Sequence, residues 1–577
     1  MRWKAWGMRN RPRWASRVLL GTAACALGGC TPLKEYVHNG FKVGPNYTTP
    51  PAAVAEHWID ASDKRVRSEQ DDLSKWWTVF NDPTLDGLIC DAYKQNLTLK
   101  EAGFRVMAAR AQLGIAIGEI FPQQQYNNGS FTRNAVSGQV ANRQFTPELY
   151  FNNWSYGFGL LWELDFWGKF RRAIESADDR LNASVFEFDD VLVTLLGDVA
   201  ANYIQLRTLE QQLAYTRENV KLQKITYDIA QAQFVGGQVS ELDPDQAQAT
   251  LSQTESQIPQ LEIQIRQAAN RLCVLLGIPT EDLQKRIGTG AIPVAPPEIV
   301  VGVPADLLRR RPDIRRNERL AASAAADIGV ADSAFYPAIS ILGNVGFSAE
   351  KFANLFTPQA LYGSIGPSFQ WNILNYGRIV NNVRFHEAKF LESVAHYQNS
   401  VLKANAEVED GIIAFVKSHQ QSRDIAESVK ASVKSVDVAL AQYKAGMIDF
   451  NRVSLLQQDL VTRQNLLAQA NGSIGLGLVQ TYKALGGGWQ IRETGCEGSC
   501  LTLAPLAPAP AGESLPEPRP ASPEAKPEMP KISPVVPESM PAKPPAKPIT
   551  KELSSPPFLL PAAWRENAIL ISEPGTP

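Results

Sequence analysis

The chain has 577 residues, and its 57 Lys and Arg residues against 59 Asp and Glu residues leave a formal net charge of −2. Because positive and negative charges nearly cancel, the protein has no excess of positive charge that would attract nucleic acid. We therefore expect no nucleic-acid partner. The sequence also lacks a phosphate-binding glycine loop followed by Lys and Ser or Thr, a His-Glu-x-x-His motif and a nucleophile arranged with a base. The absence of these motifs argues against an enzyme.

The N-terminal segment resembles the signal of a bacterial lipoprotein. Residues 1–29 carry six Lys and Arg residues and then an apolar run from Val18 to Leu27, which is too short to cross a bilayer. Small residues precede Cys30, and the resemblance implies cleavage there and lipidation of Cys30, with no other cofactor. An ordinary signal peptide with an incidental cysteine is the alternative. Thr31, rather than Asp, follows Cys30, which by the same resemblance favours the outer membrane.

The first half of the chain contains a stretch that alternates between apolar and polar residues. Every second position is apolar at Trp154, Tyr156, Phe158, Leu160, Trp162 and Leu164. This alternation predicts a strand with one apolar and one polar face, and residues 126–131 predict its partner, in a β-hairpin over residues 122–167. Residues 170–234 contain no proline and show helical spacing of apolar residues, which predicts one long coiled-coil helix. A glycine-marked turn at 236–240 and a helix to Leu276 follow.

The same order of elements recurs in the second half. Gly114–Pro122 recurs as Gly329–Pro337, and residues 166–169 recur as residues 375–378, after which the offset stays at 209. The repeat predicts a second hairpin over residues 337–375, with the alternation running to Ile373, then a long helix over 378–443, a turn at 445–449 and a helix to Leu485. We therefore predict an N-terminal segment at 30–89 and two copies of one unit, at 90–290 and 291–490.

The predicted strands suit a membrane or a soluble sheet. No run of eighteen apolar residues follows the signal, so a membrane span would have to be β. Strands of about ten residues fit a transmembrane barrel, although a soluble sandwich would alternate in the same way. Four strands cannot close a barrel alone, so the chain either oligomerises or keeps these strands out of lipid.

The cysteines, the histidines and the tail give weaker signals. Cys273 lies among apolar residues and is predicted to be a buried thiol, whereas Cys496 and Cys500 are spaced to close a small disulfide loop. We predict no metal site, because the spacing of His386, His396 and His419 gives no shared metal-binding face. Residues 491–577 form a tail that is rich in proline from Ala504, cannot bury a core and is predicted to be disordered.

Four motifs in this order resemble the outer-membrane factor family, the TolC-like and NodT-like lipoprotein channels of tripartite export systems. The motifs are Val43-Gly44-Pro45-Asn46-Tyr47, Trp76-Trp77 with Phe80-Asn81-Asp82-Pro83, Leu161–Gly168 and Asp306–Ile314. The resemblance covers about residues 30–490. It implies an α+β membrane protein that forms a homotrimer, in which three chains contribute four strands each to one twelve-stranded outer-membrane β-barrel, continuous with a long periplasmic α-helical tunnel.

The same resemblance implies a passive exit duct for small molecules in a tripartite efflux pump. An inner-membrane transporter of the RND type and a periplasmic adaptor protein would hand over the cargo. The channel would lie in outer-membrane lipid and extend into the periplasm. A type I protein-secretion channel of the same architecture is one alternative. A lipid-anchored periplasmic coiled-coil scaffold without a pore is an alternative from another class.

Two candidate sites also follow from the resemblance. It implies that the two turns dock the adaptor through Gly237, Val239, Ser240, Gly446, Ile448 and Asp449. It places the periplasmic gate just past the second turn, where the family often has aspartates. This chain has Arg452 and Leu455 there, with Asp459 nearby. Because a ring of leucines closes a pore by dewetting rather than by holding cations, we expect a basic and apolar gate.

Overall fold

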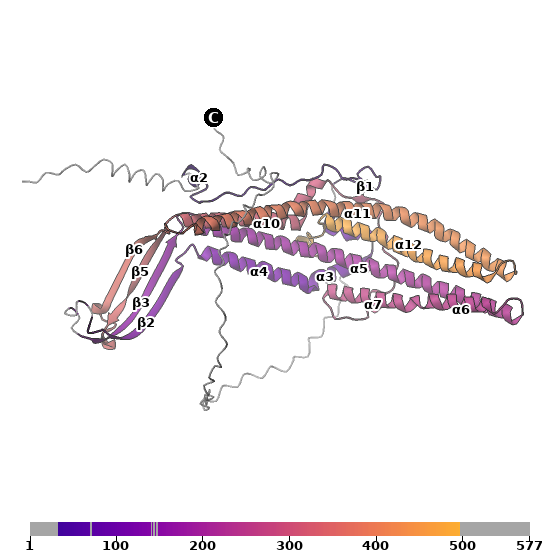
Figure 1. Cartoon of the computed structure of the whole chain (residues 1–577), viewed down its shortest axis with the longest axis horizontal. Helices are drawn as coiled ribbons and strands as arrows, with labels where there is room; N and C mark the ends of the chain where they lie inside the picture. The colour runs from indigo at the N-terminus through magenta and orange to yellow at the C-terminus, as the bar shows by residue number, and fades with distance from the viewer. Residues whose placement is uncertain (1–32, 70–71, 140, 142–144, 146–147, 497–577) are drawn as a thin grey trace, which may run out of the picture. The chain divides into compact units, whose positions relative to one another are not determined.

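The computed structural model describes residues 33–69, 72–139, 141, 145 and 148–496 (Figure 1). Cys30, the lipoprotein signal and the proline-rich tail from residue 497 onward lie outside these residues, so the expectations for them stay predictions. Among the described residues, no helix is both long enough and apolar enough to cross a membrane.

The fold repeats one order of elements twice. The first copy consists of α3 (Pro83–Gln95), α4 (Leu97–Gly118), β2 (Gln124–Ala135), β3 (Tyr150–Leu164), α5 (Lys169–Val235), α6 (Leu242–Glu255) and α7 (Gln257–Leu276). The second consists of α10 (Pro312–Asp332), β5 (Ala338–Ala349), β6 (Leu361–Gln370), α11 (Arg378–Lys444) and α12 (Phe450–Ala484). Shorter elements are α2 (Leu33–His38), β1 (Val66–Arg67), α8 (Gln284–Ile287), β4 (Ile299–Val300), α9 (Leu307–Arg310), α13 (Ile491–Thr494) and the 3₁₀ helix η1 (Leu73–Phe80).

The returning helix of the first copy is interrupted, whereas the sequence pattern predicted one helix up to Leu276. α6 ends at Glu255, and α7 begins at Gln257. The break has a local cause, because Pro259 has no N–H to donate to the carbonyl of Glu255 and its ring crowds that carbonyl. The equivalent position of the second copy is Ala468, and α12 continues without a break for 35 residues.

Four strands form one antiparallel sheet in the order β2-β3-β5-β6. Gly159 of β3 lies opposite Tyr126 of β2 and Asn344 of β5, and Asn344 lies opposite Ser364 of β6. Successive side chains point to opposite faces of a strand, so this register aligns whole rows on one face. Within the part of the chain that the structure describes, the outer edges of β2 and β6 have no partner strand.

The two faces of this sheet differ in chemistry. The apolar face carries the even-numbered residues of β3 and the odd-numbered residues of β5 and β6, among them Trp154, Phe158 and Val345. The polar face carries the odd-numbered residues of β3 and the even-numbered residues of β2, β5 and β6. The predicted alternation is present in β3, but in the second hairpin it was extended too far. β6 ends at Gln370 because β5 begins opposite it at Ala338, which leaves Ile373 without a strand to pair with.

Two helices of 67 residues, α5 and α11, run through the whole helical part, and Figure 1 shows α12 alongside them. The main core lies where α5, α7, α11 and α12 meet α3 and η1, and it includes the fully buried Leu196 and Phe415. A second, smaller core lies near the two turns, around Tyr443 and Phe450.

Glycines allow α11 and α12 to approach each other backbone to backbone. A Cβ added to Gly477 of α12 would lie 2.7 Å from the backbone N of Phe415, and one added to Gly411 of α11 would lie 2.9 Å from the backbone N of Thr481. Both distances are shorter than a van der Waals contact, so any side chain at either position must push the helices apart.

We expect Gly477→Ala and Gly114→Ala to change stability in opposite directions. Gly477→Ala should destabilise the protein by about 1–3 kcal/mol through overpacking. Gly114 lies on α4 with nothing within 4 Å of an added Cβ, so Gly114→Ala should stabilise the protein by about 0.5–1 kcal/mol through helix propensity. Thermal unfolding of the two purified variants measures both effects. Equal midpoints would contradict the close approach of α11 and α12.

Residues 41–47, which we call the strap, are held against α5 and α10 by a buried arginine. The guanidinium of Arg172 donates hydrogen bonds to the carbonyl oxygens of Val43 (3.1 Å) and Gly44 (2.9 Å) and to Oδ1 of Asn46 (3.0 Å). Gly44 has a φ of 80°, and a Cβ added to it would lie 2.4 Å from Cα of Gly329 on α10. The strap therefore fits between the two copies only with glycine at this position.

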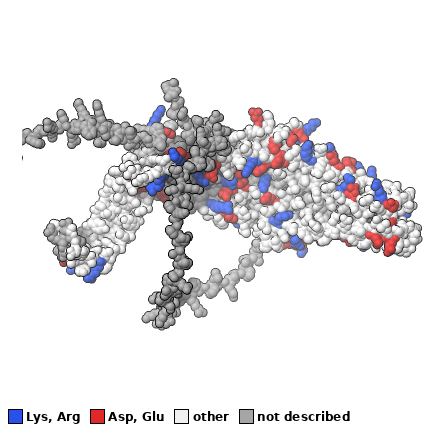
Figure 2. Space-filling model, in the orientation of Figure 1, with Lys and Arg blue, Asp and Glu red and all other residues white. Residues whose placement is uncertain are grey.

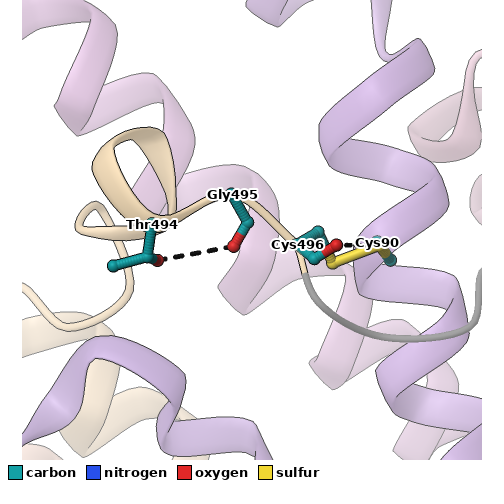
Figure 3. The surroundings of a disulfide bond; sticks show 4 residues. All are labelled: Cys90, Thr494, Gly495 and Cys496. Carbon is teal, nitrogen blue, oxygen red and sulfur yellow. Dashed lines mark hydrogen bonds between the residues drawn. A yellow bond between two sulfur atoms is a disulfide. The ribbon is translucent and has the colours of Figure 1, made fainter.

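A disulfide joins Cys90 of α3 to Cys496, which lies just beyond α13 (Figure 3). The spacing of Cys496 and Cys500 left a small disulfide loop between them open, but Cys496 is bonded instead to a cysteine 406 residues away. The last described residue of the chain is thus tied covalently to α3. Cys273 is fully buried and free, as predicted.

Candidate functional site

Both predicted turns are closed by a glycine in the left-handed region. Gly237 has a φ of 68° and Gly446 a φ of 71°, and nothing lies within 4 Å of a Cβ added to either. Each glycine N–H donates to a carbonyl of the preceding helix, that of Phe234 or Tyr443, at 2.9 Å. Glycine is required at both turns by the backbone conformation and not by lack of space.

Five of the six predicted docking residues line one pocket between the two turns. The pocket has a volume of about 750 Å³ and is lined by residues 233, 238–240 and 243 of the first copy and by residues 443–449 of the second. Val239, Ser240, Gly446, Ile448 and Asp449 are therefore brought together, while Gly237 shapes its turn without lining the pocket. Two turns that lie 209 residues apart in sequence share one surface.

A hydrogen bond between the two copies joins two residues that line this pocket. Tyr443 Oη donates to Asp243 Oδ2 at 3.0 Å, and the ring of Tyr443 packs at 5.4 Å from that of Phe450. Burial raises the pKa of Tyr443, and its hydrogen bond to the carboxylate raises it further, so the phenol stays a protonated donor. This pair could not be predicted from the sequence, because no pattern within one copy connects Tyr443 with Asp243.

The three predicted gate residues lie within the first three turns of α12, and they differ in exposure and in their partners. Asp449 caps the helix by accepting a hydrogen bond from the backbone N of Arg452 at 3.1 Å. The side chain of Arg452 is exposed, and Leu455 is 53% exposed. Asp459, in contrast, pairs with Arg463 at 2.6 Å and accepts from Ser432 at 3.3 Å. Its charge is thereby neutralised, so the basic and apolar residues dominate this stretch.

Between the two apolar cores, side-chain hydrogen bonds join the first copy to α12. Gln457 donates to Thr226 at 2.9 Å, and Thr250 and Ser454 share a hydrogen bond of 2.7 Å. All four residues are buried. Buried polar pairs of this kind fix the register of helices as long as every group keeps its partner. These buried polar contacts could not be predicted from the sequence pattern, because Thr and Gln side chains on a helix usually face solvent.

Comparison with known proteins places this geometry in a family. The pattern of the family described as "Outer membrane efflux protein" matches residues 88–278 and 303–487, which are the two copies. The chain is 30% identical over 448 residues to "Nodulation protein T" of Rhizobium leguminosarum bv. trifolii, covering 76% of this chain and 93% of that protein. It is 30% identical over 484 residues to the "Toluene efflux pump outer membrane protein TtgC" of Pseudomonas putida, covering 82% of this chain and 96% of that protein.

A solved structure agrees with these relatives. The outer-membrane channel OprN superposes with a TM-score of 0.73 at 28% identity, covering 78% of this chain and 99% of that one. The match spans the hairpins and the helices together, since almost all of that chain is covered.

Proposed function

The chain belongs to the outer membrane efflux protein family, and from this premise we propose that three copies close into one channel that carries small molecules out of the periplasm. The observation that carries this proposal is the sheet, which has one apolar face, one polar face and two edges without a partner strand among the described residues. An open edge in lipid leaves backbone groups unpaired, so β2 of one copy would pair with β6 of the next. Three sheets of four strands then give a twelve-stranded barrel, lipid outside and water inside.

The helical part would continue this duct into the periplasm. α5 and α11, each 67 residues long, leave the sheet directly after β3 and β6 and end at the two turns. The shared pocket at the turns supports docking of a periplasmic adaptor, because it offers one surface built from both copies. The adaptor would connect the channel to an inner-membrane transporter, and the channel itself would perform no chemistry.

A small-molecule cargo is favoured over an exported protein by a relative named for toluene efflux, at 30% identity over most of both chains. A lipid-anchored scaffold without a pore would not need a sheet that is apolar on one face and polar on the other. Lipid attached to Cys30 would add an anchor to the membrane without spanning it.

Arg452 and Leu455 form the proposed gate at the entrance. In a trimer, three copies of the exposed Leu455 would surround the pore close to the turns, and dewetting between them would close it. Leu455→Ser should therefore increase single-channel conductance or open probability in a planar lipid bilayer, because a hydroxyl lets water fill the constriction.

Leu466→Ser is a matched control for this test. Leu466 is 43% exposed and lies eleven residues further along α12, on the same helix face. It should change conductance little, because it is three turns away from the proposed constriction. Unchanged conductance in Leu455→Ser would contradict the gate. Failure of the native protein to conduct ions at all would contradict the channel.

A further inference from the structure

The polar face of the sheet is almost free of charge. It is formed by the even-numbered residues of β2, β5 and β6 and the odd-numbered residues of β3. Among these positions in the described strands, Glu163 is the one residue with a formal charge. Figure 2 shows the contrast, since charged side chains of both signs are spread over the helices while the visible part of the strands is mostly uncharged.

The charge of Glu163 is balanced within the same chain. Lys169 Nζ lies 3.0 Å from Oε1 and 3.1 Å from Oε2 of Glu163, so one cation contacts both carboxylate oxygens. The two charges cancel, so the pair of Glu163 and Lys169 has no net charge. A solute that stays further from the pair than the two groups lie from each other meets only the weak field of a dipole. The polar face as a whole is therefore electrically neutral.

The neutral polar groups on this face largely bind each other. The hydroxyls of Ser130 and Ser155 share a hydrogen bond of 2.8 Å across β2 and β3, and Ser364 Oγ donates to Asn344 Oδ1 at 3.1 Å across β5 and β6. Each such pair satisfies part of its own hydrogen-bonding capacity. A passing solute then finds fewer free donors and acceptors that could hold it.

Two tyrosines from the edge strands cover the glycines in the middle of this face. A Cβ added to Gly159 would lie 2.3 Å from the ring of Tyr126, so this ring lies directly over Gly159. The hydroxyl of Tyr362 lies 3.1 Å from a Cβ added to Gly346 and 3.4 Å from one added to Gly157. Aromatic side chains that lean over glycines fill the gaps left in a sheet surface and make it smoother.

We propose that the wall of the barrel does not select cargo by charge, and that any charge selection by this channel is set in the helical part, which carries the charged side chains and, at its turn end, Arg452. The inference rests on the proposed trimer, in which the polar face lines the lumen. This wall has no net charge, its polar groups bind each other, and tyrosine rings cover its glycines. Such a surface neither repels nor traps an ion of either sign. The cargo class that fits such a wall includes neutral, cationic and anionic amphiphiles alike.

Reversal potentials in a salt gradient across a planar lipid bilayer test this proposal with potassium chloride as the probe. Asn344→Asp keeps the size of the side chain and the acceptor for Ser364, but in a trimer it adds three negative charges to the wall. We expect it to raise the cation-to-anion permeability ratio severalfold, and Asn344→Lys to lower it. Asn344→Ser, a neutral change at the same position, should keep the native ratio.

A second variant tests whether the native wall is already neutral. The double substitution Glu163→Gln with Lys169→Met removes both charges and should leave the native reversal potential unchanged, whereas Arg452→Gln should shift it. The proposal is overturned if the double variant shifts the reversal potential, or if neither charged variant at Asn344 changes the permeability ratio. A protein that inserts but conducts no ions would instead contradict the proposed channel, which is a separate outcome.

Discussion

Replacing both Cys90 and Cys496 by alanine should destabilise the protein by about 3 kcal/mol, since a disulfide that closes a long loop restricts the unfolded chain. The loop closed here spans a sequence separation of 406 residues, and Cys90 is fully buried in α3. Both cysteines are replaced so that neither leaves an unpaired thiol that could form another disulfide. Thermal unfolding by circular dichroism, with and without a reductant, measures the effect.

The reductant provides the control for this prediction. It should lower the melting temperature of the native protein to that of the double variant, and it should leave the double variant unchanged. Cys273→Ala, at a buried free thiol, should keep the full response to reductant. Peptide mapping that links Cys496 to Cys500 would show that the pairing with Cys90 does not form.

Gly44→Ala should release the strap from its position between α5 and α10. The added Cβ would lie 2.4 Å from Cα of Gly329, which belongs to the backbone of α10 and cannot move aside cheaply. We expect a loss of about 3 kcal/mol, from overpacking together with a left-handed conformation that alanine adopts poorly. The carbonyl of Gly44 would also move away from the guanidinium of Arg172, which then loses a partner while buried.

Gly40→Ala separates these two causes. Gly40 also has a positive φ, of 66°, but nothing lies within 4 Å of an added Cβ. This variant should lose only about 1 kcal/mol, the cost of the backbone conformation alone. Trypsin cleavage after Lys42 reports locally on the strap and should accelerate in Gly44→Ala much more than in Gly40→Ala. Equal rates in the two variants would mean that crowding against Gly329 does not hold the strap.

The elements that depend on local patterns could be predicted from the sequence. The alternation from Trp154 to Leu164 located β3, because one face of the sheet is apolar along its whole length. The absence of proline between residues 170 and 234 located α5, whose ends differ from the prediction by one residue at each end. The break at Ser256 could also have been predicted, since Pro259 is visible in the sequence and the long helices contain no proline.

The contacts between distant segments could not be predicted in the same way. Arg172 is 0% exposed, although an arginine on a helix is usually solvated, because the strap arrives from more than a hundred residues earlier to accept its hydrogen bonds. Cys90 and Cys496 are likewise joined only by the fold. Within the candidate site, the turns and their glycines followed from sequence, whereas Asp243 and Tyr443 meet only because the two copies lie side by side.

The proline that interrupts the first returning helix makes the two hairpin ends of the tunnel mechanically unequal. In the first copy the helical hydrogen bonding is interrupted at Ser256, which makes this point easier to bend, whereas α12 is one unbroken helix of 35 residues. A trimer would then present six ends of two alternating kinds, three hinged and three stiff. A partner with sixfold symmetry would therefore meet two non-equivalent kinds of docking position.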